Sequence, residues 1–327
     1  MSWAPLCTPN VVTPTTLRGR GPLDRPVKTV NDGRMPHAEA NGIRIYYEEA
    51  GDPGAPPLLL IMGLGGQLIH WPPELMAGLA DRGFQVIAFD NRDVGLSTHL
   101  DVPVDVLAVL AARGSGETAA VPYLLRDMAD DAAGLLDHLG VDRAHVVGAS
   151  LGGMVAQTLA IEHPARVATL TSIMSTTGDP DVGMPTAESM AVLMAAPVTT
   201  RDEYLEVTVR NSHVYGSPGL VDDDRIREVA AVAWERSHDP AGAARQLAGV
   251  LASGSRSEAL AALDVPTLVL HGTADTLVQP DGGERTAEVV PDAKLLMIEG
   301  MGHDLPVSML PQVIDAVAAH AAAHPLR

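Results

Sequence analysis

A serine at the end of an apolar run is the first residue in this sequence that could do covalent chemistry. The run at residues 145–148 leads directly into the sequence GASLG at residues 148–152, and a helix-like stretch follows. A sharp turn between a strand and a helix lifts a serine hydroxyl above a sheet, and it requires small residues two positions before and after the serine. Gly148 and Gly152 meet this requirement. The spacing favours Ser150 as a nucleophile over a chance match in a chain rich in Gly and Ala.

A serine hydroxyl needs an adjacent base to attack at neutral pH, and the chain offers twelve histidines. His303 lies in the sequence GMGHD at residues 300–304, directly after the last apolar run and before a helical pattern. Sheets of α/β proteins place their active groups on loops of this kind. We therefore predict that His303 is the base, in preference to a capping or solvent-exposed loop histidine.

The acid that orients such a histidine should follow an earlier strand. Asp275 lies a few residues past the apolar run at 267–271. Asp179 and Asp181, which follow another run ending near Met174, are the competing acids. We prefer Asp275 to these two, and to its simpler role as a turn aspartate that bonds its own backbone.

The elements that must hold these residues are indicated by short, nearly continuous apolar runs. The runs are Leu58 to Met62, Phe84 to Phe89, His145 to Gly148, Val167 to Met174, Thr267 to His271 and Lys294 to Ile298. Such runs are typical of parallel strands buried on both faces. Helical patterns separate most of them, most clearly at residues 122–139, where Pro122 suits the first turn. This alternation predicts βαβ units with right-handed crossovers.

Three further segments complete the predicted organisation. Asn41-Gly42 between two strand-like stretches predicts a hairpin with a type I′ turn, because both residues tolerate positive φ angles. Residues 1–34 are rich in Pro, Thr, Arg and Gly without a period, which predicts a disordered or loosely attached extension. About 90 residues between Met174 and Val265 carry helical patterns and predict a cap above the sheet. The expected helices span residues 186–196, 200–213, 222–238 and 240–252.

Several of these patterns together resemble the α/β-hydrolase superfamily. They are GASLG at 148–152, HGTAD at 271–275 and GMGH at 300–303, in that order, with DNRDVGLS at 90–97 similar to the loop after the family's fourth strand. The resemblance covers about residues 36–322. IMGLGG at 61–66 and GMGHDLP at 300–306 are similar to actinobacterial carboxylesterases and to the aclacinomycin methylesterase group.

The resemblance implies an α/β fold with a mostly parallel central sheet flanked by helices and a helical cap inserted after the sixth strand. The implied core spans residues 35–174 and 259–327, and the implied cap spans 175–258. By position, the backbone N–H groups of Leu64 and Leu151 would form the oxyanion hole. Many members carry His-Gly where this chain has Met62-Gly63, but the donor there is a backbone group and the change does not remove it.

The residues and the resemblance together predict a carboxylic ester hydrolase that forms an acyl-enzyme on Ser150 and uses no cofactor. Its expected partner is a small, apolar ester. A thioesterase and a carbon–carbon bond hydrolase use the same residues and stay open as alternatives. A non-catalytic ligand receptor on the same scaffold also stays open, and turnover of a short p-nitrophenyl ester would discriminate it.

Composition restricts the remaining classes. The formal net charge of −19 argues against nucleic-acid binding, because such a chain repels phosphate. No apolar run approaches the roughly 20 residues that span a bilayer. Cys7 is the only cysteine, so no intrachain disulfide can form, and without an apolar signal segment we expect a cytoplasmic protein. No H-E-x-x-H or Cys/His cluster predicts a metal site, and no feature sets the oligomeric state.

Overall fold

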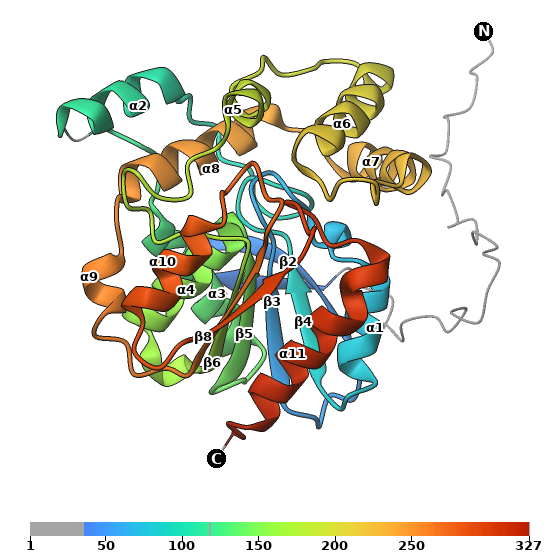
Figure 1. The fold of residues 1–327 in the computed structure, drawn as a ribbon, viewed down its shortest axis with the longest axis vertical. Coiled ribbons are helices and arrows are strands. Elements are labelled where there is room, and N and C mark those ends of the chain that lie inside the picture. The colour runs from blue at the N-terminus through green and yellow to red at the C-terminus, as the bar shows by residue number, and fades with distance from the viewer. Residues whose placement is uncertain (1–35, 118, 327) are drawn as a thin grey trace, which may run out of the picture.

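A computed structural model describes residues 36–117 and 119–326 and shows an eight-stranded sheet (Figure 1). The strands lie in the order β1-β2-β4-β3-β5-β6-β7-β8. Their bounds are β1 His37–Ala40, β2 Ile43–Ala50, β3 Pro57–Ile61, β4 Gln85–Phe89, β5 Ala144–Ala149, β6 Val167–Ile173, β7 Thr267–Gly272 and β8 Lys294–Ile298. Strands β3 to β8 are parallel, and β1 and β2 pair antiparallel at one edge. The predicted mostly parallel α/β sheet is therefore confirmed. The predicted extension at residues 1–34 lies outside the described residues.

The local sequence explains both kinds of strand. Every residue of β5, β6 and β7 is buried, as expected for apolar strands covered on both faces. The β1–β2 hairpin turns at Asn41 and Gly42, whose φ angles of 48° and 78° suit a type I′ turn. The predicted hairpin is thus present, with its turn at the predicted residues.

Helices cover both faces of the sheet. Helices α3 Leu125–His138, α4 Leu151–Glu162, α9 Ser257–Leu260 and α10 Asp281–Val289 pack on one face. Helices α1 Pro73–Ala80 and α11 Leu310–Ala322 pack on the other. Short 3-10 turns lie at η1 Leu68–His70, η2 Pro164–Arg166 and η3 Val307–Met309. The predicted start of α3 at Pro122 is wrong: the Asp127 side chain accepts the N–H of Leu124 and begins the helix at Leu125.

A layer of helices lies above the carboxyl ends of the strands (Figure 1). Four of them follow β6 and are called the cap here: α5 Ala187–Leu193, α6 Arg201–Tyr215, α7 Asp223–Arg236 and α8 Pro240–Ser253. They lie close to the four predicted segments. A fifth helix, α2 Val106–Ser115, precedes β5 in sequence and packs against α8. The layer therefore combines two separate stretches of the chain, and no sequence pattern predicted α2. Among the described residues, no helix is both long enough and apolar enough to cross a bilayer.

Candidate active site

Ser150 lies alone between the end of β5 and the start of α4. Its φ of 56° and ψ of −122° are unfavourable for a residue with a side chain, so the turn stores backbone strain. The two flanking glycines make that turn possible. A Cβ on Gly148 would lie 2.0 Å from the carbonyl oxygen of Gly152, and a Cβ on Gly152 would lie 1.9 Å from that of Ile61. The sequence GASLG therefore has glycine where the backbone leaves no room for any other residue.

The three residues singled out for catalysis meet at the carboxyl ends of three strands. The Nε2 atom of His303, on the loop after β8, lies 2.9 Å from Oγ of Ser150. Its Nδ1 atom lies 2.7 Å from Oδ2 of Asp275, on the loop after β7. The other carboxylate oxygen of Asp275 accepts the backbone N–H groups of Leu277 and Val278, both at 2.9 Å. The imidazole is thus held between a fixed acid and the serine hydroxyl.

The environment of Asp275 keeps its carboxylate ionised. Burial alone would raise the pKa of Asp275, but the charge of His303 and hydrogen bonds from His271 and His303 lower it to about 2. His271 is completely buried, and its Nε2 atom lies 3.4 Å from Oδ2 of Asp275 and 2.8 Å from the carbonyl oxygen of Val278. His271 begins the HGTAD segment, but its residue type and position alone did not indicate this contact with Asp275.

The competing acids lie elsewhere. Asp179 accepts Nε of Arg285 at 2.9 Å and the hydroxyl groups of Ser255 and Ser257. Asp181 is exposed. Within the described residues neither carboxylate is bonded to His303, and the geometry therefore favours Asp275.

The two residues expected to supply the oxyanion hole, Leu64 and Leu151, lie in segments that adjoin the serine. Leu151 is the first residue of α4, and Gly63 packs so closely that its Cβ would lie 3.2 Å from that of Ser150. Asn91, in the segment similar to the family loop, donates its side-chain N–H to the carbonyl oxygen of Met62 at 2.9 Å and fixes this turn. Both Leu64 and Leu151 line the same cavity as Ser150. Among the described residues, no group accepts a hydrogen bond from the backbone N–H of Leu64 or of Leu151.

The cap holds the loop that carries His303. The N–H of His303 donates to the carbonyl oxygen of Tyr215 at 2.6 Å, and the N–H of Gly302 donates to Oγ of Ser217 at 2.8 Å. Oδ1 of Asp304 accepts both the N–H and the hydroxyl of Ser217, at 2.9 and 2.5 Å. Burial raises the pKa of Asp304. Because these contacts join residues far apart in sequence, no local pattern indicates them.

A cavity of about 220 Å³ opens beside Ser150. Its wall is mainly apolar and is formed by the core, the cap and α2. The cap and α2 contribute Met190, Leu193, Leu247, Val250, Leu251, Leu110 and Arg113, and the loop before α5 contributes Met184. The serine hydroxyl thus faces a space suited to an apolar molecule.

Comparison with known proteins identifies the family. A sequence profile described as the alpha/beta hydrolase fold matches residues 56–307. The chain belongs to the alpha/beta hydrolase fold family. It is 30% identical over 300 residues to rhodomycin D methylesterase DauP from Streptomyces sp. strain C5, covering 85% of this chain and 95% of that protein. It is 26% identical over 280 residues to the bifunctional esterase/perhydrolase DCH of Acinetobacter calcoaceticus, covering 82% and 92%.

Solved structures agree on the fold of this hydrolase. A meta-cleavage product hydrolase from Pseudomonas fluorescens IP01 superposes with a TM-score of 0.67 at 20% identity, over 87% of this chain and 96% of that one. At this identity the likeness is one of fold. The family and the named relatives together make the chain a hydrolase.

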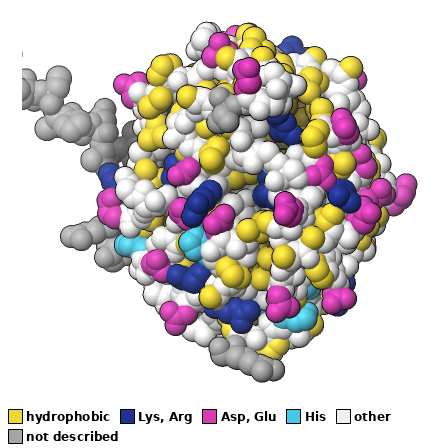
Figure 2. All heavy atoms as spheres, turned by 90° about the vertical axis from the view of Figure 1, so that its left-hand side faces the viewer, with side chains coloured by type: hydrophobic (Ala, Val, Ile, Leu, Met, Phe, Trp, Pro, Cys, Tyr) yellow, Lys and Arg dark blue, Asp and Glu magenta, His cyan; other side chains and the backbone are white. Residues whose placement is uncertain are grey.

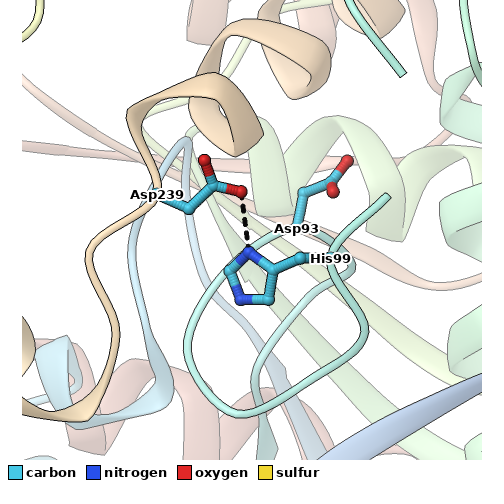
Figure 3. A group of neighbouring side chains, drawn as sticks. All are labelled: Asp93, His99 and Asp239. Atoms are coloured by element: carbon cyan, nitrogen blue, oxygen red, sulfur yellow. Dashed lines mark hydrogen bonds and ion pairs between the residues drawn. The ribbon is translucent and has the colours of Figure 1, made fainter. Parts of the chain in front are cut away.

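One cluster in this α/β hydrolase has the residue types of a metal site. The side chains of Asp93, His99 and Asp239 bring their ligand atoms within 4.8 Å of one another (Figure 3). Nη2 of Arg245, however, lies 2.8 Å from Asp93 Oδ1 and 2.9 Å from Asp239 Oδ2. The hydroxyl of Tyr123 bonds the other oxygen of Asp93 at 2.7 Å. An internal guanidinium already balances these carboxylates, and the cluster joins the loop after β4 to the start of α8.

Proposed function

We propose that this hydrolase cleaves carboxylic esters through an acyl-enzyme on Ser150. The observation that supports this most strongly is the chain of hydrogen bonds from Ser150 through His303 to Asp275, at 2.9 and 2.7 Å, beside an apolar cavity. A serine bonded to a histidine that is itself oriented by a buried carboxylate is the arrangement that activates a hydroxyl for acyl transfer.

The reaction would proceed in two steps. Ser150 attacks the ester carbonyl while His303 takes the hydroxyl proton at Nε2. Asp275 stays ionised, fixes the imidazole tautomer and stabilises the imidazolium. The N–H groups of Leu64 and Leu151 stabilise the oxyanion, and no acceptor within the described residues competes for them. His303 then protonates the leaving alkoxide and later activates the water that releases the acid. No step draws on a cofactor.

The substrate we propose is a small-molecule ester with an apolar acyl part and a small alcohol. The apolar cavity supports the first feature. The named activity of the Streptomyces relatives, removal of a methyl ester, supports the second.

Labelling and turnover test the proposal together. The wild type should hydrolyse a short p-nitrophenyl ester with multiple turnovers and should be inactivated by a fluorophosphonate, with the adduct on the peptide that contains Ser150. Ser150→Ala should lose about 10⁴-fold or more in kcat with its fold intact. Ser115→Ala is the matched control, because this exposed hydroxyl donates to the carbonyl oxygen of Ala112 and does not line the cavity.

Each alternative gives a distinct result. Stoichiometric binding without turnover would indicate a ligand receptor. A thioester turned over far faster than its matched oxygen ester would indicate a thioesterase. Near-wild-type turnover in folded Ser150→Ala would remove the central claim.

A further inference from the structure

Two arginines line the cavity beside Ser150, although most of its wall is apolar. Arg113 comes from α2, and Arg256 follows α8. The chain as a whole has 41 acidic and 22 basic residues. The side of the molecule that carries α2, α9 and α10 shows acidic, basic and apolar side chains interspersed (Figure 2). The pair of cations is therefore a local feature of the cavity rather than part of a basic surface.

Arg256 is deeply buried, with 8% of its surface exposed, and its hydrogen-bond partners are neutral. Its guanidinium donates to the side-chain oxygen of Gln157 at 3.1 Å and to the carbonyl oxygens of Thr176 and Gly254, at 2.7 and 3.4 Å. Burial, with repulsion from Arg113, lowers the pKa of Arg256 to about 10, although the charge of Asp179 acts in the opposite direction, so the group remains a cation at neutral pH.

Among residues 36–117 and 119–326, the hydrogen-bond partners of Arg113 are backbone carbonyls. Its Nη2 atom lies 3.0 Å from the carbonyl oxygen of Gly178, and its Nη1 atom lies 3.5 Å from that of Leu251. Asp179 is the acid that lines this wall. Its carboxylate accepts hydrogen bonds from Arg285 and from two serine hydroxyls. In the described part of the chain, no carboxylate hydrogen-bonds either Arg113 or Arg256.

A buried cation without a hydrogen-bonded anion is unfavourable, because neutral partners replace only part of its lost hydration. A guanidinium has five N–H donors, and the contacts above use at most three of them on Arg256 and two on Arg113. A purely structural role would explain why Arg256 ties together Gln157, Thr176 and Gly254. It does not explain why a second cation from a separate helix lines the same wall.

We propose that Arg113 and Arg256 form a subsite for a carboxylate that the substrate carries on its acyl part, separated from the ester by an apolar segment. This inference rests on the proposed ester hydrolysis and names its substrate class as half-esters of dicarboxylic acids and related ester-acids. The apolar wall takes the intervening segment, and the two guanidinium groups replace the hydration of the carboxylate.

A matched pair of substrates tests the subsite. One series consists of monomethyl esters of straight-chain dicarboxylic acids of increasing length. In the other, an isopropyl group of similar shape replaces the carboxylate. The wild type should give a higher kcat/KM for the half-ester at one optimal length. Arg113→Met and Arg256→Met should each reduce the ratio of the two kcat/KM values by about 10- to 100-fold, as expected for a charged hydrogen bond.

The control variant is Arg126→Met, which removes an exposed arginine on α3 that pairs with Glu162 at 3.6 Å and does not line the cavity. Its ratio should equal that of the wild type. A wild-type preference for the neutral ester at every length, or an equal loss of ratio in Arg126→Met, would overturn the proposal. If Arg256→Met does not fold, the ratio measured for Arg113→Met, a variant at a half-buried residue, decides the result.

Binding separates this inference from the function on which it rests. Absence of turnover for every ester, p-nitrophenyl esters included, would refute ester hydrolysis. The subsite is then judged by calorimetric titration of Ser150→Ala with octanedioate and with the homologous dicarboxylates. Binding that Arg113→Met weakens tenfold or more supports the subsite. No binding, or binding that is indifferent to Arg113, refutes it.

Discussion

Replacement of Gly302 by alanine tests whether the contact between the cap and the histidine loop sets the catalytic geometry. A Cβ on Gly302 would lie 2.4 Å from the carbonyl carbon of Gly216, 2.5 Å from its oxygen and 2.6 Å from the nitrogen of Ser217. All three are backbone atoms and cannot rotate away. Ordinary contact begins at 3.4 Å, so the loop or the cap must move by about 1 Å.

That movement acts directly on the proposed base. His303 is the next residue, and its N–H is bonded to Tyr215 on the cap side of the contact. A shift of about 1 Å would stretch the 2.9 Å separation between His303 Nε2 and Ser150 Oγ beyond hydrogen-bond range. Misplacement on this scale reduces rates by about 10²-fold, and overpacking destabilises a fold by about 1–3 kcal/mol. We therefore expect Gly302→Ala to lower kcat/KM for a short p-nitrophenyl ester about 100-fold, with fluorophosphonate inactivation slowed in parallel.

The same loop offers a matched control in Gly300→Ala. Gly300 has a φ of +72°, but no atom lies within 4 Å of its would-be Cβ. Alanine there adds backbone strain of about 1–2 kcal/mol without pushing on the cap. It should lower the melting temperature and keep most of the activity. The reasoning is refuted if folded Gly302→Ala retains kcat/KM within threefold of the wild type, or if Gly300→Ala loses as much activity.

The site and its surroundings support four further predictions. Asp275→Asn should reduce kcat by about 10⁴-fold, because it favours the wrong imidazole tautomer. Single-turnover kinetics would measure the lowered rate of the chemical step. The pKa of Asp275 is lowered to about 2 in the folded state. The ionised carboxylate therefore stabilises the fold fully above the unfolded pKa of about 4, and this stabilisation is lost as pH falls toward 2. Urea unfolding of wild type and Asp275→Asn across that window should therefore converge at low pH, and a constant difference would contradict the assignment. Met190→Ala should change the acyl-length preference, whereas Met194→Ala should not, because Met190 lines the cavity and Met194 does not. Equal effects across an ester series would place Met190 in the core. A chain starting at Met35 should keep its melting temperature within a few degrees and its ester profile, whereas a fall of many degrees would make residues 1–34 part of the folded enzyme.

Local patterns in the sequence were enough to predict the sheet and to single out the residues that meet at its edge. Apolar runs indicate buried parallel strands, and glycines at 148 and 152 indicate a turn that only glycine permits. Ser150, Asp275 and His303 each follow a strand, so their convergence follows from the parallel arrangement.

Other parts of the site depend on contacts that no local pattern encodes. Ser217 reaches Gly302 and Asp304 across more than 80 positions of sequence, and its type alone is unremarkable for a loop. Helix α2 has apolar residues around most of its circumference, and of these Val109 is buried while Leu107 and Leu110 are exposed. Its sequence therefore lacks the one-sided apolar pattern that predicts a helix packed on a core. Arg256 is distinctive only through its burial and its neutral partners, which become visible once the loops after β6 and α8 are placed side by side.

The composite origin of the layer above the sheet bears on how specificity evolves in this lineage. The cap enters the chain after the nucleophile, but Leu110 and Arg113 are encoded before it, on α2. A recombination event that exchanged only the segment between β6 and β7 would import part of a foreign cavity wall and retain part of the native one. Such chimaeras would inherit mismatched halves of one binding surface. New substrate ranges should therefore arise through coordinated changes in two distant stretches of the gene. The sequence of α2 should co-vary with that of the cap rather than with that of the core segments on either side of it.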